Sequence, residues 1–126
     1  MCIRDRIEKS LIIKNILPCV YNRVKADPPE SNIFEAVNLF QNHKADGVIG
    51  FGGGSSMDVA KAVSYFSINN ANIKECYGVN NLKNVRCPLI QIPTTAGTGS
   101  EVTPNIVSCS LLPLTFIMSI STMFFV

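Results

Sequence analysis

Three consecutive glycines, Gly52–Gly54, separate the apolar segment Val48–Phe51 from a segment in which apolar residues recur at helical spacing. The apolar segment has the composition of a buried strand. Glycine has no Cβ, so the loop backbone can take a positive φ and approach a ligand closely. The first turn of the following helix presents unpaired N–H groups to an anion. The stretch therefore predicts a strand, a phosphate-binding loop and a helix in succession, with a simple tight turn as the alternative.

The helix after the loop is expected over about Ser56 to Phe66, with Ser55 or Ser56 as its N-cap. The hydroxyl of either serine could equally donate to a phosphate oxygen. Its apolar positions form one broad face, which predicts packing on a sheet; they are Met57, Val59, Ala60, Ala62, Val63 and Phe66. Neither common phosphate-binding motif fits the loop. The pattern G-x-G-x-x-G would need a glycine at Ser55, and the P-loop would need Gly-Lys followed by Ser or Thr.

The composition is that of one small globular domain, since 47% of the 126 residues are hydrophobic and 16% are charged. A net charge of +2 without a basic cluster gives no electrostatic basis for binding nucleic acid. The five cysteines are widely spaced and form no C-x-x-C pair, which argues against a disulfide framework and a zinc site. We therefore expect a reducing compartment and no nucleic-acid partner.

The two ends of the chain differ from its middle. Met1–Arg6 resembles a translated adapter sequence and receives no structural weight. No charged residue follows Glu101, so Val102–Val126 is long enough on paper to cross a bilayer. Prolines, an asparagine and serines interrupt this run, and no basic flank follows it. We therefore do not expect a membrane anchor.

The first half of the chain alternates between predicted helices and strands. Ile7–Lys14 is expected to be the last part of a helix. A short strand is expected over 16–21, and Pro18 indicates that it lies at an edge of the sheet. A turn at Asp27–Pro29 then leads into a second helix.

The second helix has Ser31 or Asn32 as the predicted cap and Gly47 as the residue just past its end. Its buried stripe is expected to be Ile33, Val37 and Phe40. A further strand is predicted over 88–92, after a polar connector over 71–87. Strands that alternate with helices predict an α/β fold with a parallel sheet covered by helices on both faces.

A second loop follows the predicted strand 88–92. The segment Pro93–Thr103 holds five hydroxyl side chains and two glycines. Parallel sheets bind ligands at the carboxyl ends of their strands, and Gly52–Ser55 lies at the same edge. We therefore expect the two loops to face one crevice, while a Ser/Thr-rich surface turn remains the alternative.

The two motifs, Gly52–Ala62 and Pro93–Thr103, together resemble those of the iron-containing alcohol dehydrogenase family. Asp27-Pro28 is similar to the family's Asn-Pro position, and Tyr77–Val79 suits its connector. The resemblance covers roughly residues 10 to 107. It implies a Rossmann-like nucleotide-binding domain, which is followed in the family by a helical, metal-holding domain.

The resemblance also implies a set of cofactor-binding residues: Gly52, Gly53, Gly54, Ser55, Asp58, Thr94, Thr95, Thr98 and Ser100. Gly53, Gly54 and Ser55 would hold the pyrophosphate of the cofactor. Thr94 and Thr95 would border the nicotinamide or its ribose, and Thr98 and Ser100 would complete the polar wall. Asp58 is expected in the first helical turn, facing the cleft, where an interaction with the helix dipole is an equal alternative.

The family's metal ligands are an aspartate and histidines of the helical domain. This chain has one histidine, His43, which we expect to be an ordinary solvated residue. We therefore expect no catalytic or metal-binding residue here, and expect the metal ligands downstream. The chain is interpreted as a fragment truncated at both ends, with a partial NAD(P)-binding domain over 7–107. Residues 108–126 are interpreted as an aberrant apolar tail from a frameshift or read-through, with no core to join.

The resemblance implies part of a metal-dependent, NAD(P)-linked alcohol dehydrogenase that interconverts alcohols and aldehydes or ketones by hydride transfer. Its cofactors would be NAD or NADP and, in the complete enzyme, a divalent metal, iron or zinc. A small alcohol or carbonyl substrate, a cytoplasmic or mitochondrial location and a homo-oligomer are expected with it. A non-enzymatic nucleotide-binding or interaction module is the alternative.

Overall fold

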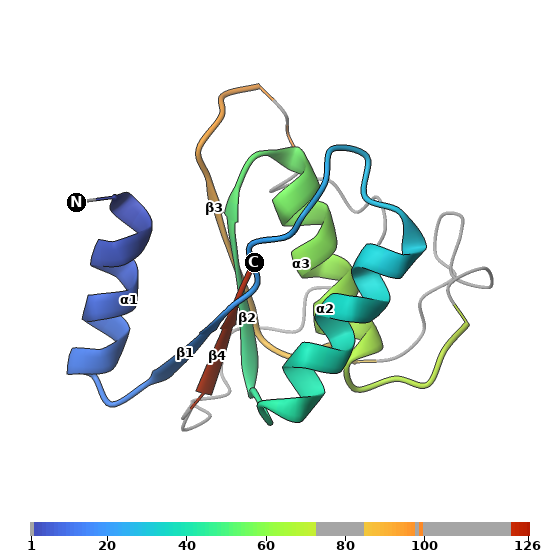
Figure 1. Cartoon of the computed structure of the whole chain (residues 1–126), viewed down its shortest axis with the longest axis horizontal. Coiled ribbons are helices and arrows are strands. Elements are labelled where there is room, and N and C mark those ends of the chain that lie inside the picture. The colour runs from blue at the N-terminus through green and yellow to red at the C-terminus, as the bar shows by residue number, and fades with distance from the viewer. Residues whose placement is uncertain (1, 73–84, 98, 100–121) are drawn as a thin grey trace.

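The computed structural model of the chain describes residues 2–72, 85–97, 99 and 122–126 (Figure 1). Three helices and four strands lie in these ranges. In chain order they are α1 (Ile3–Ile13), β1 (Leu17–Val20), α2 (Glu30–Asn42), β2 (Gly47–Gly52), α3 (Gly54–Phe66), β3 (Leu89–Pro93) and β4 (Thr122–Phe125).

The four strands form one parallel sheet in the order β1-β4-β2-β3. β2 and β3 are direct neighbours, and α3 lies between them in the sequence, so these three elements form the predicted βαβ unit. The α/β fold with a Rossmann-like parallel sheet is therefore confirmed. β1 lies at one edge of the sheet, as expected from Pro18.

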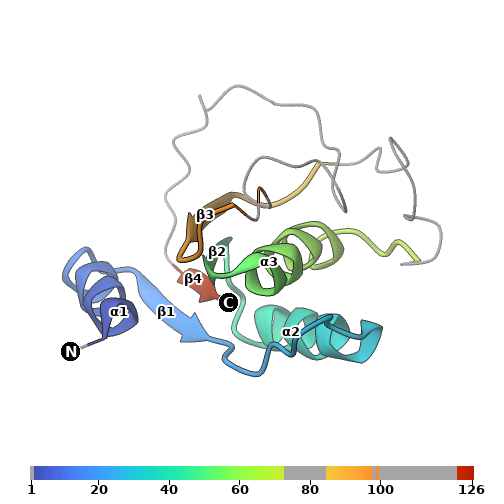
Figure 2. The same cartoon turned by 90° about the horizontal axis from the view of Figure 1, so that it is seen from above.

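Helices cover both faces of the sheet (Figures 1 and 2). Successive residues of a strand point to opposite faces. Val48 accordingly packs in the larger core cluster with residues of α2 and α3, whereas Ile49 packs with Ile7 and Leu11 of α1. The apolar face predicted for α3 is buried, and Val37 and Phe40 of α2 are buried as predicted, with Ile33 at the margin of the same core.

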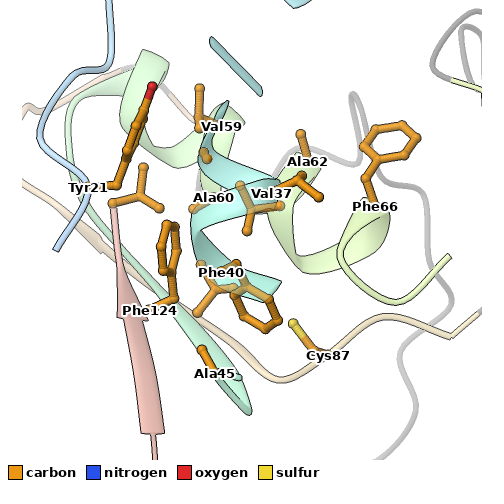
Figure 3. Packing of buried hydrophobic residues seen from close by; sticks show 14 of the residues in the cluster. Tyr21, Val37, Phe40, Ala45, Val59, Ala60, Ala62, Phe66, Cys87 and Phe124 are labelled. Atoms are coloured by element: carbon orange, nitrogen blue, oxygen red, sulfur yellow. The ribbon is translucent and has the colours of Figure 1, made fainter. Parts of the chain in front are cut away.

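The last residues of the chain belong to the sheet. The apolar tail over 108–126 was expected to have no core to join. Its described part contradicts this, because β4 lies between β1 and β2 and is parallel to both. The Phe124 side chain is fully buried, 6.4 Å from the Tyr21 ring and 5.6 Å from the Phe40 ring between centroids (Figure 3). Among the described strands, β4 is the only one that pairs with β1.

The helix caps differ from the predicted ones. The N-cap of α2 is Pro29 and that of α3 is Gly53, and neither makes a side-chain cap hydrogen bond. The predicted cap Asn32 is instead buried, where its amide donates to the Arg23 carbonyl at 3.1 Å and its side-chain oxygen accepts from the Lys25 N–H at 3.2 Å. A tertiary role thus replaces the capping role that Asn32 was predicted to have.

Two helix boundaries were also predicted wrongly. α1 begins at Ile3, so residues that were given no structural weight form its first turn. The chain leaves α2 through His43 and then Lys44, which has a φ of +50°, while the predicted stop residue Gly47 is the first residue of β2. Lys44 takes the left-handed conformation that glycine most often supplies after a helix.

Gly50 lets α3 lie close against β2. A Cβ on Gly50 would be 2.7 Å from the Cβ of Ala60 and 3.6 Å from the Cα of Met57. Side chains cannot approach that closely, so any larger residue at this position would push the helix away from the strand. From the sequence, Gly50 was predicted only as part of a strand, and this packing role was not predicted.

We expect Gly50→Ala to destabilise the protein by about 1–3 kcal/mol, since overpacking a tight contact costs that much. Urea denaturation followed by circular dichroism measures the change. The double variant Gly50→Ala/Ala60→Gly should lose less stability than the sum of the two single variants, because it removes the second Cβ of the clash. Additive losses would show that the helix does not press on Gly50.

We expect Phe124→Ala to cost about 3–5 kcal/mol, as is usual for a buried aromatic side chain. Phe34, whose exposed fraction is 48%, is the matched control, and Phe34→Ala should cost less than about 1 kcal/mol. Equal losses in the two variants, measured by the same denaturation, would contradict the placement of β4 in the sheet.

Candidate functional site

The glycine loop connects β2 to α3 through a single residue, Gly53. Gly52 has a φ of +148°, which L side chains rarely adopt, so this position requires glycine. Gly53 has a φ of −85°, and a Cβ there would meet Thr95 Oγ1 at an ordinary 3.5 Å. The predicted positive φ is therefore found at Gly52, and the backbone of Gly53 would tolerate a side chain.

The two predicted loops lie side by side at the carboxyl edge of the sheet. The Thr94 N–H donates to the Gly52 carbonyl at 2.8 Å, and the Thr95 side chain is the neighbour of Gly53. Gln91 of β3 adds a third link, because its amide donates to the Met57 carbonyl at 3.1 Å. The structure thus brings together the predicted residues Gly52, Gly53, Thr94 and Thr95.

The start of α3 presents backbone donors at this edge. The helical hydrogen bond from the Met57 N–H reaches the Gly53 carbonyl at 3.2 Å, so the N–H groups of Gly54, Ser55 and Ser56 precede the helical ladder. Neither predicted serine caps the helix. These N–H groups and the positive end of the helix dipole favour an anionic ligand.

Asp58 lies in the second turn of α3, not in the first as predicted. The Lys61 ammonium donates a hydrogen bond to the Asp58 carboxylate at 3.2 Å. Only 4% of the Lys61 side chain is exposed, against 34% of the Asp58 side chain. Asp58 therefore compensates a buried positive charge, which neither of its two predicted roles included.

Two predicted residues, Thr98 and Ser100, lie outside the described residues. Their neighbours Gly97 and Gly99 have φ values of +84° and +64°, in the left-handed region. Residues with a side chain rarely adopt such φ values, so glycine suits both positions.

A cavity of about 270 Å³ opens at the same edge, on the β1 side of the glycine loop. It is lined by the start of α1, the end of β1 and the residues after it, Phe51, Ser56 and Val126. Its wall is fixed by Tyr21, whose hydroxyl donates to Glu35 of α2 at 3.1 Å. Burial and this hydrogen bond raise the pKa of Tyr21 to about 12, so its hydroxyl keeps the proton through the physiological range. Sequence reasoning did not find this cavity, because its walls come from segments far apart in the chain.

The described residues contain no group of three or more His, Cys, Asp or Glu side chains that could hold a metal ion. His43 is exposed at the C-cap of α2. Of the cysteines, Cys2, Cys19 and Cys87 have free thiols. Within the part of the chain that the structure describes, no helix is long and apolar enough to span a bilayer.

A parallel α/β sheet with a glycine loop, unpaired helix N–H groups and a second hydroxyl-bearing loop at one edge is typical of nucleotide-binding proteins. Comparison with known proteins identifies the family within this class of nucleotide-binding proteins. The family model for iron-containing alcohol dehydrogenase matches residues 2–110. The chain therefore belongs to the iron-containing alcohol dehydrogenase family.

Individual relatives agree with the family match. The NAD-dependent methanol dehydrogenase of Bacillus methanolicus is 32% identical over 99 residues, which is 79% of this chain and 26% of the relative. Alcohol dehydrogenase 4 of Saccharomyces cerevisiae is 33% identical, covering 78% of this chain and 26% of its own length. The chain thus spans about a quarter of these relatives.

Solved structures give the same result. An alcohol dehydrogenase from Oenococcus oeni superposes with a TM-score of 0.74 at 38% identity, over 78% of this chain and 26% of that one. An iron-containing alcohol dehydrogenase from Thermotoga maritima superposes with a TM-score of 0.72 at 33% identity, over 97% of this chain and 35% of that one.

We expect the Asp58–Lys61 pair to respond unequally to removal of its two members. Asp58→Asn removes the carboxylate that lies beside a buried ammonium and should cost about 2–3 kcal/mol, less than for a fully buried pair because Asp58 is partly exposed. Lys61→Met removes the buried charge and leaves a carboxylate that water can reach, so it should cost less than about 1 kcal/mol. Thermal and urea denaturation measure both, and equal losses would contradict the asymmetry.

Proposed function

We propose that the chain is the dinucleotide-binding part of a metal-dependent alcohol dehydrogenase that interconverts alcohols and aldehydes or ketones, with NAD or NADP as hydride carrier. The observation that carries the proposal is the glycine loop, where unpaired N–H groups of α3 lie beside a positive-φ glycine and the Thr95 side chain. The family membership supports it, and one relative is named as NAD-dependent.

The residues at the loop fit a dinucleotide. Its diphosphate carries the negative charge that the start of α3 favours. Gly52 and Gly53 leave the space above the loop free of side chains of their own, so the backbone N–H groups of Gly54 and Ser55 can approach phosphate oxygens. Thr94 and Thr95 would then lie along the adjoining part of the cofactor.

The nicotinamide ring, when bound, supplies the hydride acceptor or donor of the reaction. The role proposed for this chain is to bind and orient that cofactor. The loop is held at both ends, by the packing of α3 on Gly50 and by the hydrogen bond from Thr94 to Gly52, and such rigidity lowers the entropic cost of orienting a ligand.

The described residues do not fit the divalent metal of the proposed complete enzyme, since they contain no cluster of ligating side chains. No step through iron or zinc is therefore assigned to these residues. The ligands are proposed to lie in the helical domain that the family resemblance implies.

Finer aspects of the proposal are a cytoplasmic or mitochondrial location and a homo-oligomer, with a small alcohol or carbonyl compound as substrate. The free thiols of Cys2, Cys19 and Cys87 fit a reducing compartment. The net charge of +2 gives no reason to add a nucleic-acid partner.

Gly53→Ala tests cofactor binding directly. Its Cβ would make only an ordinary contact with Thr95, so we expect a change in the free energy of unfolding within about 1 kcal/mol. The same Cβ would stand where the backbone approaches the diphosphate, so the dissociation constant for NADH should rise about tenfold, or about 1.4 kcal/mol. Fluorescence titration of NADH measures this.

Gly52→Ala is the contrasting variant, because its φ of +148° and a contact of 2.9 Å with Ser56 Oγ predict a loss of stability as well. If Gly53→Ala folded normally and bound NADH as the unmodified chain does, the loop would be only a turn. The proposed cofactor site would then have to depend on Thr94 and Thr95.

A further inference from the structure

Gln91 is a polar side chain at the centre of β3, between apolar residues. It is half-buried, and its amide donates to the Met57 carbonyl of α3 at 3.1 Å. Burying an amide costs free energy unless the amide makes a hydrogen bond. An apolar residue would fill this strand position without that cost, so the bond to α3 is what distinguishes Gln91 from its neighbours in β3.

Gln91 and Gly50 are paired in the sheet, so both positions face α3. At Gly50 the helix lies against bare backbone, because a Cβ there would be 2.7 Å from the Cβ of Ala60. Beside it, the longer Gln91 side chain reaches the Met57 carbonyl at the end of the first helical turn. A close contact with one strand and a hydrogen bond from the next strand thus act on the same part of α3.

The two contacts constrain the helix in different ways. Packing on Gly50 limits how closely α3 approaches the sheet, but it leaves the helix able to roll about its axis. A helical carbonyl accepts from the N–H four residues later and has a second lone pair for another donor. The Gln91 amide donates to this carbonyl from the side of β3, so it opposes rotation of the first turn. Such rotation would change the direction of the N–H groups of Gly54 and Ser55.

From this geometry we infer that Gln91 is a positioning residue for the cofactor, whose hydrogen bond to α3 holds the N–H groups of Gly54 and Ser55 in the direction of their anionic ligand. The inference rests on the proposed function. Gln91 acts through the Met57 carbonyl and not by contact with the cofactor. From the sequence it was predicted only as part of a strand, because a strand pattern does not show which side chain reaches a neighbouring helix.

Gln91→Met tests the inference in the full chain, because methionine has a similar length and donates no hydrogen bond. The dissociation constants for ADP and NADH should rise about threefold to tenfold, as for other residues that act on a ligand through a neighbour. The melting temperature should fall by less than about 8 °C, the effect of about one hydrogen bond. Gln91→Thr suits a strand but cannot reach α3, so it should weaken binding to a similar extent. Isothermal titration calorimetry and thermal melts measure these changes.

Residual dipolar couplings, measured by NMR without ligand, report the direction of each N–H bond. In Gln91→Met the couplings of Gly54 and Ser55 should change, while those of α2 stay the same within error. If Gln91 only stabilised the fold, the melting temperature would fall and these couplings would not change, which would overturn the positioning role.

Gln41→Met is the matched control, because the Gln41 amide donates to the Ser67 carbonyl at 3.0 Å, at the other end of α3. This variant removes the same kind of hydrogen bond from the same helix, so it should lower the melting temperature by a similar amount. The binding of ADP and NADH and the couplings of Gly54 and Ser55 should be unchanged.

Normal ADP binding by both the unmodified chain and Gln91→Met would overturn the inference alone. Equal weakening of ADP binding by Gln41→Met and Gln91→Met would also overturn it, since binding would then follow overall stability. If the unmodified chain bound neither ADP nor NADH, the proposed function would fail, and the inference with it.

Discussion

The close packing of α3 on β2 at Gly50 determines the position of the whole candidate site. One residue, Gly53, separates the strand from the helix, so the connection has no slack, and any displacement of the helix would move its first N–H groups by a similar amount. A Cβ on Gly50 would be only 2.7 Å from the Cβ of Ala60, which shows how little room remains between β2 and α3. The donors at the loop are therefore held by core packing, and the hydrogen bond from Thr94 to Gly52 transmits the same rigidity to the second loop.

Burial of α3 also places constraints on its charges. The helix is buried from Met57 to Phe66 except at Asp58, so the Lys61 ammonium has little access to water and needs a compensating charge. Asp58 supplies that charge from one turn earlier. Because the Lys61 ammonium offsets the Asp58 charge, the carboxylate repels an anion at the start of α3 less than an unpaired carboxylate would. The N-terminus of α3 thus keeps its attraction for an anion even though an acidic residue lies only one turn away.

The sequence predicted the elements that are specified by local pattern. The apolar stripe of α3, the strands β2 and β3, and the edge position of Pro18 follow from side-chain periodicity and from what proline can do in a sheet. The loops at the carboxyl edge could be placed together because parallel strands bring those ends to one side. The caps were predicted wrongly, since a serine or asparagine near a helix start caps only if the turn before it has the right geometry, and Asn32 is drawn into hydrogen bonds with the β1–α2 connection.

β4 and the cavity could not be predicted in the same way, because both depend on contacts between distant parts of the chain. Nothing local in Thr122–Phe125 indicates that it lies between β1 and β2, and that pairing is set by the buried ring of Phe124 against Tyr21 and Phe40. The donors proposed for the diphosphate, by contrast, are mainly backbone groups, so their sequence signal is the set of glycines that exposes them. This is why the binding loop was found from sequence, while β4 and the cavity, which depend on contacts between distant segments, were not.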